Sequence, residues 1–510
     1  MNLKERSKNT FKNSAIGLVS QILQILSSIV CRVVFVRTLV EAYLGVNGLF
    51  ANILSILSLG ELGIGSAITY ELYRALAYDR KENTKSLMAY YKKAYTTIGI
   101  LIGIAGLILA PFITHFVSMD PSVRESVYLL YFIYLGNTVV SYFYSYKSSI
   151  ISASQQNYVL SLIHMAVTIA QNIIQCFVLL LTRNFLLYLL IQVSATFLYN
   201  LFVSRRADKM FPIITEKDVE PLPEEQKKRM FKNIRDIFLT NVSQKLVNST
   251  DNIIITAYGG LVSTGLNSNY SLLTATLKTL TNKVYEGVLA SVGNVNAVES
   301  TEKKLALFDE VQFFFFWMFY WCSLTFALLV EDLIGFAFGE KYIMTFAVAV
   351  ITGLNFYTAE QATVVRIFKN TMGLFRYGKF VSLGTGIINV ILSIILGRIY
   401  GVEGILFATF ISLITTTRWY LPYCVFKYGF KTNPVHFFKR DFRYWAEAAL
   451  LFFVTWKLCL LVNYSRPLNL LAKFLICLIV PNGLLVLLHI RDRNLISVIN
   501  RIKKIILRKK

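Results

Sequence analysis

Charged residues are scarce in this 510-residue chain, and acidic residues are the scarcer kind. Asp, Glu, Lys and Arg make up 16% of the sequence, with 29 acidic and 52 basic residues. Because a soluble globular domain carries about 25% charged residues, this composition excludes an ordinary water-soluble protein. The chain is instead 55% hydrophobic, with a mean hydropathy of +0.54.

The sequence also lacks the residue patterns of several kinds of catalytic or metal centre. The six cysteines lie in or beside apolar stretches without paired spacing, which argues against a disulfide framework and against a metal site. The sequence has no glycine-rich phosphate loop with its lysine, so ATP hydrolysis is not indicated. We therefore expect no metal and no other cofactor.

Long apolar runs are abundant. We count about fourteen, each near the ~20 residues that cross a hydrocarbon core of ~30 Å. They cover 13–38, 44–68, 94–117, 126–150, 159–181, 185–203, 235–258, 264–290, 311–335, 343–366, 379–398, 403–421, 444–463 and 470–490. The sequence therefore predicts an all-α polytopic membrane protein.

Basic residues gather on one side of these spans. With the N-terminus in the cytoplasm, the outer loops hold five basic residues: Arg124, Arg183, Lys341, Arg398 and Arg466. This asymmetry follows the positive-inside rule and predicts that both termini are cytoplasmic. The net charge of +23 then matches the anionic inner leaflet, and we expect membrane lipids rather than nucleic acid as partners. The first run is too long for a cleaved signal peptide, so we interpret it as an uncleaved span.

A weak internal repeat predicts two halves. Residues 11–60 align without gaps on 231–280, and Phe11-Lys12-Asn13 corresponds to Phe231-Lys232-Asn233. Both copies begin inside, which predicts parallel six-helix repeats around a transport site near the membrane midplane. The expected parts are a six-helix bundle at 1–203, a charged, proline-containing cytoplasmic linker at 204–234, a six-helix bundle at 235–421, two additional transmembrane helices at 422–490, and a basic tail at 491–510 that forms an interfacial helix.

Polar side chains recur at helical spacing within three spans. The first span carries Gln21, Gln24, Ser28 and Arg32, the seventh Asn241, Lys245, Asn248 and Asn252, and the eighth Asn267, Tyr270, Thr274, Lys278, Thr281 and Tyr285. Each set lies on one helical face, and exposing such a face to lipid costs several kcal/mol per group. We therefore expect these faces to line a shared, water-filled, cationic cavity.

Seven residues are the candidates for binding an anionic substrate: Lys278, Lys245, Arg32, Lys283, Asn248, Asn267 and Tyr270. Lys278 lies near mid-span, where a lysine costs roughly 2.5–3.5 kcal/mol even on the mild insertion scale. The alternative is a lysine that neighbouring Thr and Asn side chains satisfy. Lys283 and Arg37 lie nearer helix ends, from which long side chains can reach the interface.

Four residues are candidates for gating or ion coupling: Asp251, Glu61, Glu360 and Arg37. Arg32 and Asp251 occupy nearly equivalent depths in the two repeats, so we predict that they pair as an outward gate. The alternative is a static ion pair. Glu61, and Glu360 with Arg366, either bind a coupling ion or belong to buried ion pairs.

Several short motifs carry a resemblance to a known family. They are Phe11-Lys12-Asn13, the run Tyr-Leu-Gly-Val-Asn-Gly-Leu at 43–49, Glu-Leu-Gly-Ile-Gly-Ser-Ala-Ile at 61–68, and Ser-Thr-Asp-Asn-Ile-Ile-Ile at 249–255, which Tyr270 follows. In these motifs and in its layout the chain resembles the polysaccharide transporter family. This family comprises the lipid-linked oligosaccharide flippases of the multidrug/oligosaccharidyl-lipid/polysaccharide exporter superfamily.

The resemblance implies two six-helix bundles around a cavity that opens alternately to each side. It implies a polyprenyl-diphosphate-linked glycan as substrate, and Arg32, Lys245 and Lys278 as the basic residues of the cavity. It also implies a bacterial cell membrane, with a polysaccharide polymerase and glycosyltransferases of the same pathway as partners, and no enzymatic activity.

Other functions stay open at this point. A peptidoglycan-precursor flippase shares the same charge requirements, and a cation-coupled multidrug exporter belongs to the same superfamily. A membrane glycan polymerase or acyltransferase needs catalytic residues on a sizeable external loop, and the outer connections here are short.

Overall fold

The computed structural model describes residues 3–58, 64–78, 80–116, 121–216, 218–298, 300–374 and 377–507. For some stretches, 235–249 among them, it describes the backbone alone. Regular secondary structure throughout these residues is helical, which confirms the predicted fold class. The α-helices are α1 Leu3–Thr38, α2 Glu41–Leu57, α3 Ile64–Ala77, α4 Lys81–Leu109, α5 Ile113–Phe116, α6 Val127–Tyr142, α7 Ser148–Ala153, α8 Asn157–Thr182, α9 Phe185–Met210, α10 Glu224–Val298, α11 Thr301–Ala337, α12 Phe346–Thr371, α13 Lys379–Thr415, α14 Thr417–Cys424, α15 Val435–Leu460, α16 Arg466–Leu488 and α17 Arg493–Leu507.

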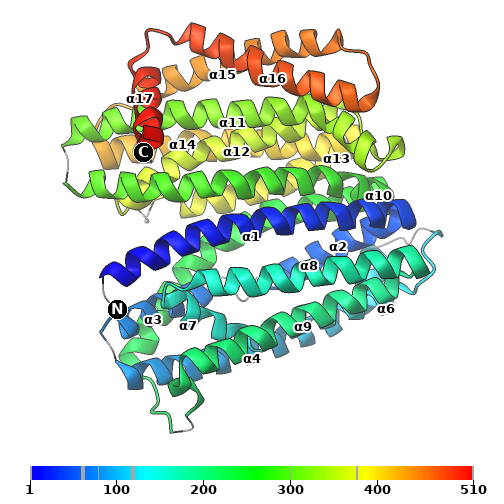
Figure 1. Cartoon of the computed structure of the whole chain (residues 1–510), viewed down its shortest axis with the longest axis vertical. Coiled ribbons are helices and arrows are strands. Elements are labelled where there is room, and N and C mark those ends of the chain that lie inside the picture. Colours follow the sequence, from blue (N-terminus) through cyan, green and yellow to red (C-terminus); the bar gives the residue numbers. More distant parts are fainter. Residues whose placement is uncertain are drawn as a thin grey trace. The chain divides into compact units, whose positions relative to one another are not determined.

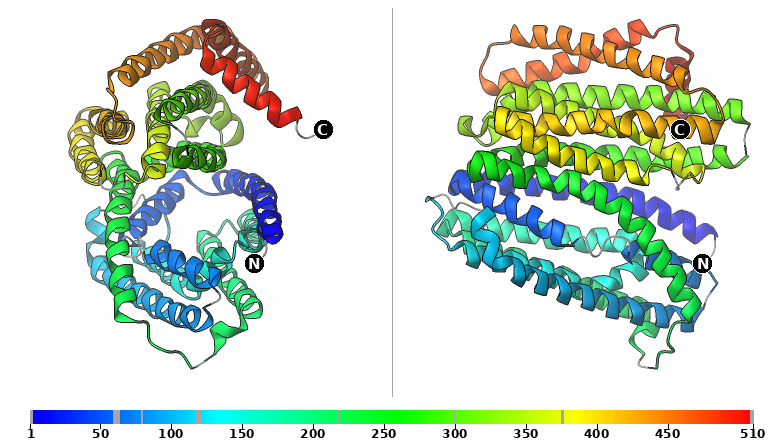
Figure 2. Two further views of the ribbon diagram at one scale, coloured as in Figure 1. Left: turned by 90° about the vertical axis from the view of Figure 1, so that its left-hand side faces the viewer. Right: turned by 180° about the vertical axis from the view of Figure 1, so that it is seen from behind.

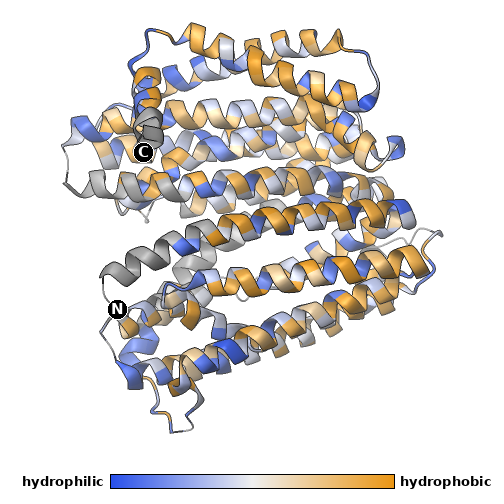
Figure 3. Cartoon of the chain, in the orientation of Figure 1, coloured by the Kyte–Doolittle hydropathy of each residue, from blue (hydrophilic) through white to orange (hydrophobic). Residues whose placement is uncertain are grey.

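Within the described residues, eight helical segments are long and apolar enough to cross a membrane. Figure 3 shows the long hydrophobic stretches of α8, α9 and α16, with hydrophilic residues toward helix ends. One of these segments, Phe380–Phe430, is 51 residues long, about twice the length that a single crossing needs. It contains two of the predicted spans.

Two long helices are in fact hairpins. In α10 the side-chain oxygens of Thr256 and Thr264 lie 2.7 Å apart, although eight residues of continuous helix would separate them by about 12 Å. The chain reverses at Gly260, whose φ of 75° suits glycine. In α13, Asn389 donates to Thr409 at 2.9 Å across a second reversal at Gly401, φ 62°. The reversals lie between the seventh and eighth, and between the eleventh and twelfth, predicted spans.

The chain divides into two compact units, Met1–Gly265 and Leu266–Lys510. Helix α10 begins in the first unit and ends in the second. The sequence placed the second bundle at 235–421, whereas this division groups the seventh span with the first unit. The functional domain boundaries stay a prediction.

In the first unit, α8 packs along α1 on one side and along α9 on the other, as Figure 1 shows. Helix α6 joins α9 to α4. Aliphatic and aromatic side chains of α3, α4 and α7, among them Leu72, Leu87 and Ile150, form a fully buried core. Burying these side chains stabilises the packing of the three helices by roughly 25 cal/mol per Å² of apolar surface removed from water. In the predicted topology these helices meet at the inner end of the unit.

Helix α11 is the centre of the second unit. Its most apolar window is 61% buried, against 17% for that of α16. The run Phe313–Phe316 is apolar all round, which is typical of a helix that other helices cover on every side. Helices α12, α15, α16 and α17 all contact α11, and Figure 2 shows α11 beside its neighbours from two further directions. This unit therefore packs around one aromatic helix.

The C-terminal helices are joined to α11 by polar contacts as well as apolar ones. On α16, Lys473 lies 2.5 Å from Asp332 of α11, and Trp317 of α11 donates to Asn482 at 2.6 Å. Arg466 forms an ion pair with Glu340 beyond the end of α11. Helix α17 confirms the predicted helical tail, and its Leu495 and Val498 are buried in the core around α11.

The predicted linker 204–234 is helical at both of its ends. Helix α9 continues to Met210, and α10 begins at Glu224. A helix can continue beyond the membrane through charged residues. The point at which hydrophobicity falls is therefore not the point at which the helix ends. Pro212 ends α9, because proline disfavours helical geometry in the residue before it.

Helices α2 and α10 approach each other at two glycines that the internal repeat aligns. A Cβ on Gly45 would overlap the backbone of Leu261, and a Cβ on Gly265 would lie 2.8 Å from the carbonyl oxygen of Glu41. Backbone therefore contacts backbone at this crossing, as it does where small residues mediate close helix packing in membranes. Our topology places the contact at the outer ends of the second and eighth spans.

We predict that Gly45→Ala lowers the thermal unfolding temperature in detergent, because overpacking costs about 1–3 kcal/mol. Gly136→Ala on α6 is the matched control, since a Cβ there meets no atom within 4 Å. Alanine favours helix over glycine by about 1 kcal/mol, so this control keeps or raises the unfolding temperature. Equal behaviour of the two variants would contradict the close crossing.

Candidate substrate-binding site

The best candidate site in the second unit is an ion pair between α10 and α12. Lys278 Nζ lies 3.5 Å from Glu360 Oε1, and the lysine side chain is 46% exposed while the glutamate side chain is 5% exposed. A buried carboxylate needs a cation, and Lys278 supplies one. An ammonium group has three donors, so a half-exposed lysine in such a pair keeps donors for an anionic ligand.

Arg366 is the second cation near Glu360. It folds back onto its own helix, α12, where Nη2 donates to Thr363 Oγ1 at 2.6 Å and to the Ala359 carbonyl at 3.2 Å. Its guanidinium is within electrostatic range of Glu360. The sequence suggested a pair of Glu360 with Arg366, and the structure adds Lys278. Two cations facing one carboxylate leave a net charge of +1, which favours an anion.

Two of the predicted binding residues are packed into the protein in this conformation. Tyr270 is fully buried, and its hydroxyl accepts the backbone N–H of Met344 at 2.9 Å, just before α12 begins. Asn267 is also buried on the same half of α10. The Tyr270 hydroxyl ties α10 to the segment before α12, and, because both side chains are buried, neither presents a surface to a ligand here. Lys283, in contrast, is exposed on α10.

In the first unit, the polar face of α1 meets polar groups of other helices. Asn172 of α8 donates to Ser27 Oγ at 2.8 Å and to Ser28 Oγ at 3.3 Å. Arg32 is half-buried, within electrostatic range of Tyr134 on α6 and Tyr188 on α9. Ser28 and Arg32 of this face thus lie close to polar groups of other helices, and the shared cavity stays a prediction.

Tyr134 and Gln175 extend this polar region. Tyr134 donates to Asn47 Oδ1 of α2 at 2.6 Å, and Gln175 of α8 donates to the Tyr188 carbonyl at 3.0 Å. We did not single out Asn172 or Gln175 from the sequence. With Gln171 they form a polar face at three- and four-residue spacing within an apolar span, and this signal would have identified them.

The remaining predicted residues are placed as follows. Asp251 is half-buried on the first half of α10, and Arg37 is exposed in the last turn of α1. The side chains of Lys245 and Asn248 on α10, and all of Glu61, lie outside the described residues. The proposed Arg32–Asp251 gate and the ion-coupling roles stay predictions.

No protein-family model matches the sequence, and no curated protein sequence matches it significantly. Solved structures do match. The chain is similar to the lipid II flippase MurJ in an inward closed conformation, with a TM-score of 0.67 and 15% identity over 96% of this chain and 99% of MurJ. It is also similar to an inward-facing multidrug resistance MATE family transporter, with a TM-score of 0.58 and 14% identity over 80% of this chain and 97% of the transporter.

A third structure, a point mutant of the MATE transporter VcmN of Vibrio cholerae, gives a TM-score of 0.54 at 12% identity, over 84% of this chain and 99% of that one. At these identities the likeness concerns the fold. It extends over nearly the whole length of both the flippase and the exporters. The chain therefore shares the fold of this lipid II flippase and of these MATE transporters.

Proposed function

We propose that this protein moves a polyprenyl-diphosphate-linked oligosaccharide from the inner to the outer leaflet of a bacterial cell membrane, by alternating access, for cell-surface polysaccharide synthesis. The observation that carries the proposal is the half-exposed Lys278 beside the buried Glu360 and Arg366. In a chain with an exporter fold, this cluster offers a cation to an anionic ligand at membrane depth.

Electrostatics favours this direction of transport. A diphosphate cannot cross hydrocarbon unaided, and basic groups in a low-dielectric cavity replace its hydration. With the inside negative, moving two negative charges outward gains roughly 4–5 kcal/mol per 100 mV. The cluster at Lys278 supports binding of the diphosphate, and the membrane potential favours its release outside.

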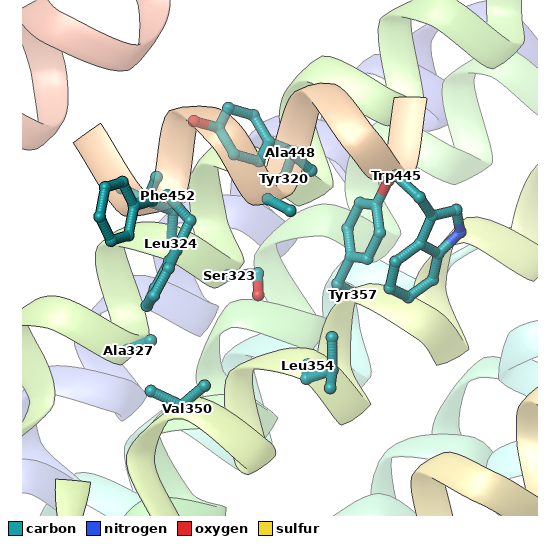
Figure 4. A pocket seen from close by; sticks show the side chains of 12 residues that line it. Tyr320, Ser323, Leu324, Ala327, Val350, Leu354, Tyr357, Trp445, Ala448 and Phe452 are labelled. Carbon is teal, nitrogen blue, oxygen red and sulfur yellow. The ribbon is translucent and has the colours of Figure 1, made fainter. Parts of the chain in front are cut away.

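The lipid part of such a substrate needs an apolar surface. A cleft of about 330 Å³ lies between α11, α12 and α15, lined mainly by apolar and aromatic side chains such as Leu324, Val350 and Phe452. Figure 4 shows Phe452 toward one side of it and Tyr357 and Trp445 toward the other, with the small residues Ser323 and Ala327 among the residues that line it. We propose that a segment of the polyprenyl chain occupies this cleft during transport.

A second candidate is a peptidoglycan-precursor flippase, because the structure with the TM-score of 0.67 is that of a lipid II flippase. Both substrates are anionic amphiphiles, so the Lys278 cluster and the apolar cleft suit either. A multidrug exporter fits these features less well, since organic cations favour an acidic cavity over a lysine.

The first prediction concerns the substrate. Depletion of the protein in its host leads to accumulation of a polyprenyl-diphosphate glycan in the inner leaflet, measured by mass spectrometry of extracted lipids with a leaflet-specific probe. Accumulation of the peptidoglycan precursor would instead establish the second candidate. An unchanged set of lipid-linked glycans would refute both and favour drug efflux.

The second prediction separates binding by Lys278 from its structural role. Lys278→Ala leaves Glu360 with less compensation and lowers both thermal stability and transport, whereas Lys278→Met/Glu360→Leu/Arg366→Met removes all three charges and restores stability. If Lys278 binds substrate, the triple variant stays transport-deficient by about tenfold or more, since a charge-assisted contact contributes roughly 1.5–3 kcal/mol. Recovery of transport together with stability would reduce Lys278 to a structural role.

The third prediction concerns the apolar cleft. Ala448→Trp on α15 fills the cleft and slows transport without loss of the folded protein, which size-exclusion chromatography checks. Leu450→Trp is the matched control, because Leu450 is 57% exposed and does not line the cleft. Transport equal in the two variants would show that the cleft does not hold the lipid chain.

A further inference from the structure

A second cleft, of about 740 Å³, lies at the beginning of α15 and differs in chemistry from the first. Its lining combines two cations and one carboxylate, Arg418, Lys439 and Asp441, with apolar side chains from α13 and α15. None of these residues belongs to the Lys278 cluster. The cleft therefore requires an explanation beyond the transport site.

Arg418 is the charged group at the base of this cleft. Its residue is 8% exposed, and Nη2 donates to Asp441 in an ion pair. Its Nε, however, is buried and has no hydrogen-bond partner in the described part of the chain. A buried guanidinium nitrogen without an acceptor is costly, and native structures rarely leave one so. Asp441 therefore satisfies the Arg418 guanidinium only in part, and the same side chain lines the cleft.

The charge of the cleft is positive. Asp441 is balanced by Arg418, and Lys439 is exposed at the rim, so the lining carries a net +1. The adjacent Arg440 is turned to α11, where it contacts Asp309 at 2.6 Å and Gln312 at 2.9 Å. Arg418 and Lys439 are thus the cations that this cleft offers to an anionic group.

Apolar surface continues from these cations. Phe438 and Phe442 line the same cleft, and Phe442 is 76% exposed. Trp445 lines both this cleft and the apolar one of about 330 Å³. The Arg418 guanidinium lies 5.8 Å from the centroid of the Trp445 ring, and the centroids of the Tyr357 and Trp445 rings lie 4.8 Å apart. A ligand with an anionic head group and an apolar chain matches this arrangement, in which a cationic surface adjoins an aromatic and apolar one.

The predicted topology places the cleft in the cytoplasmic leaflet. Arg418 ends the twelfth predicted span, and Asp441 precedes the thirteenth, so both lie at the inner membrane surface. The lipids of that leaflet include anionic phospholipids, which attract basic residues near the surface. Free phosphate would leave Phe442 and Phe438 uncovered, whereas a phospholipid covers both the cations and the aromatic rings.

We propose that the cleft formed by Arg418, Lys439, Phe438, Phe442 and Trp445 binds one anionic phospholipid of the inner leaflet. The phosphate contacts Arg418 and Lys439, and the first part of an acyl chain lies against Trp445. This lipid is a constituent of the folded protein in the membrane and is distinct from the transported substrate.

Native mass spectrometry of the purified full-length protein in detergent tests the proposal. The protein is supplied separately with phosphatidylglycerol and with phosphatidylcholine of identical acyl chains. We expect phosphatidylglycerol to bind about tenfold more tightly, and Lys439→Glu to abolish that preference. Lys209→Glu, the same charge reversal at an exposed position of α9, keeps it.

Arg418→Gln is the second variant, and Arg418→Gln/Asp441→Asn removes the partner charge so that the fold survives the change. We expect both to lose the preference. Equal binding of the two lipids by the wild type, or an unchanged preference in Lys439→Glu, overturns the proposal. Inorganic phosphate that displaces phosphatidylglycerol at millimolar concentration overturns it too, because the cleft would then bind phosphate without a lipid. The glycan-accumulation experiment is read independently, so either proposal can fail alone.

Discussion

The cost of placing charge in a low-dielectric medium governs this structure. Three acidic side chains in the long helices of the second unit have a basic partner on another helix: Glu360 with Lys278, Asp332 with Lys473, and Asp441 with Arg418. Each pair ties two helices together, because loss of either member would leave an uncompensated charge that costs several kcal/mol. The positions of the pairs therefore specify which helices pack side by side.

Of these pairs, the one at Lys278 differs in exposure. Its lysine is half-exposed, whereas the lysine of the Lys473–Asp332 pair is 19% exposed. The Lys473–Asp332 pair is suited to holding α16 against α11, whereas Lys278 keeps hydrogen-bond donors that a ligand can use. The same physical requirement thus produces both a structural tie and a candidate site, and solvent access to the cation distinguishes them.

Much of the fold could be predicted from the sequence, because hydrophobic length and charge asymmetry are local signals. The reversals at Gly260 and Gly401 lie where the sequence separated spans. The helix ends near 204–234 could not be predicted in this way, since a helix continues into water without hydrophobic residues. The partner of Glu360 could not be predicted either. Lys278 and Glu360 are 82 positions apart, and only helix packing brings them together.

Helix α15 is held unevenly along its length. Its polar contacts to α11 and α14 in the described residues, through Arg440 and Asp441, lie in its first two turns. Farther along, Ala448, Phe452 and Phe453 border the apolar cleft. Toward the end remote from Arg440 the contacts of α15 with the rest of this unit are apolar, as in the stacking of Trp456 on Phe346, and apolar contacts let side chains shift more easily than ion pairs do. In our topology that end faces the outer leaflet, the side on which a delivered lipid chain must leave.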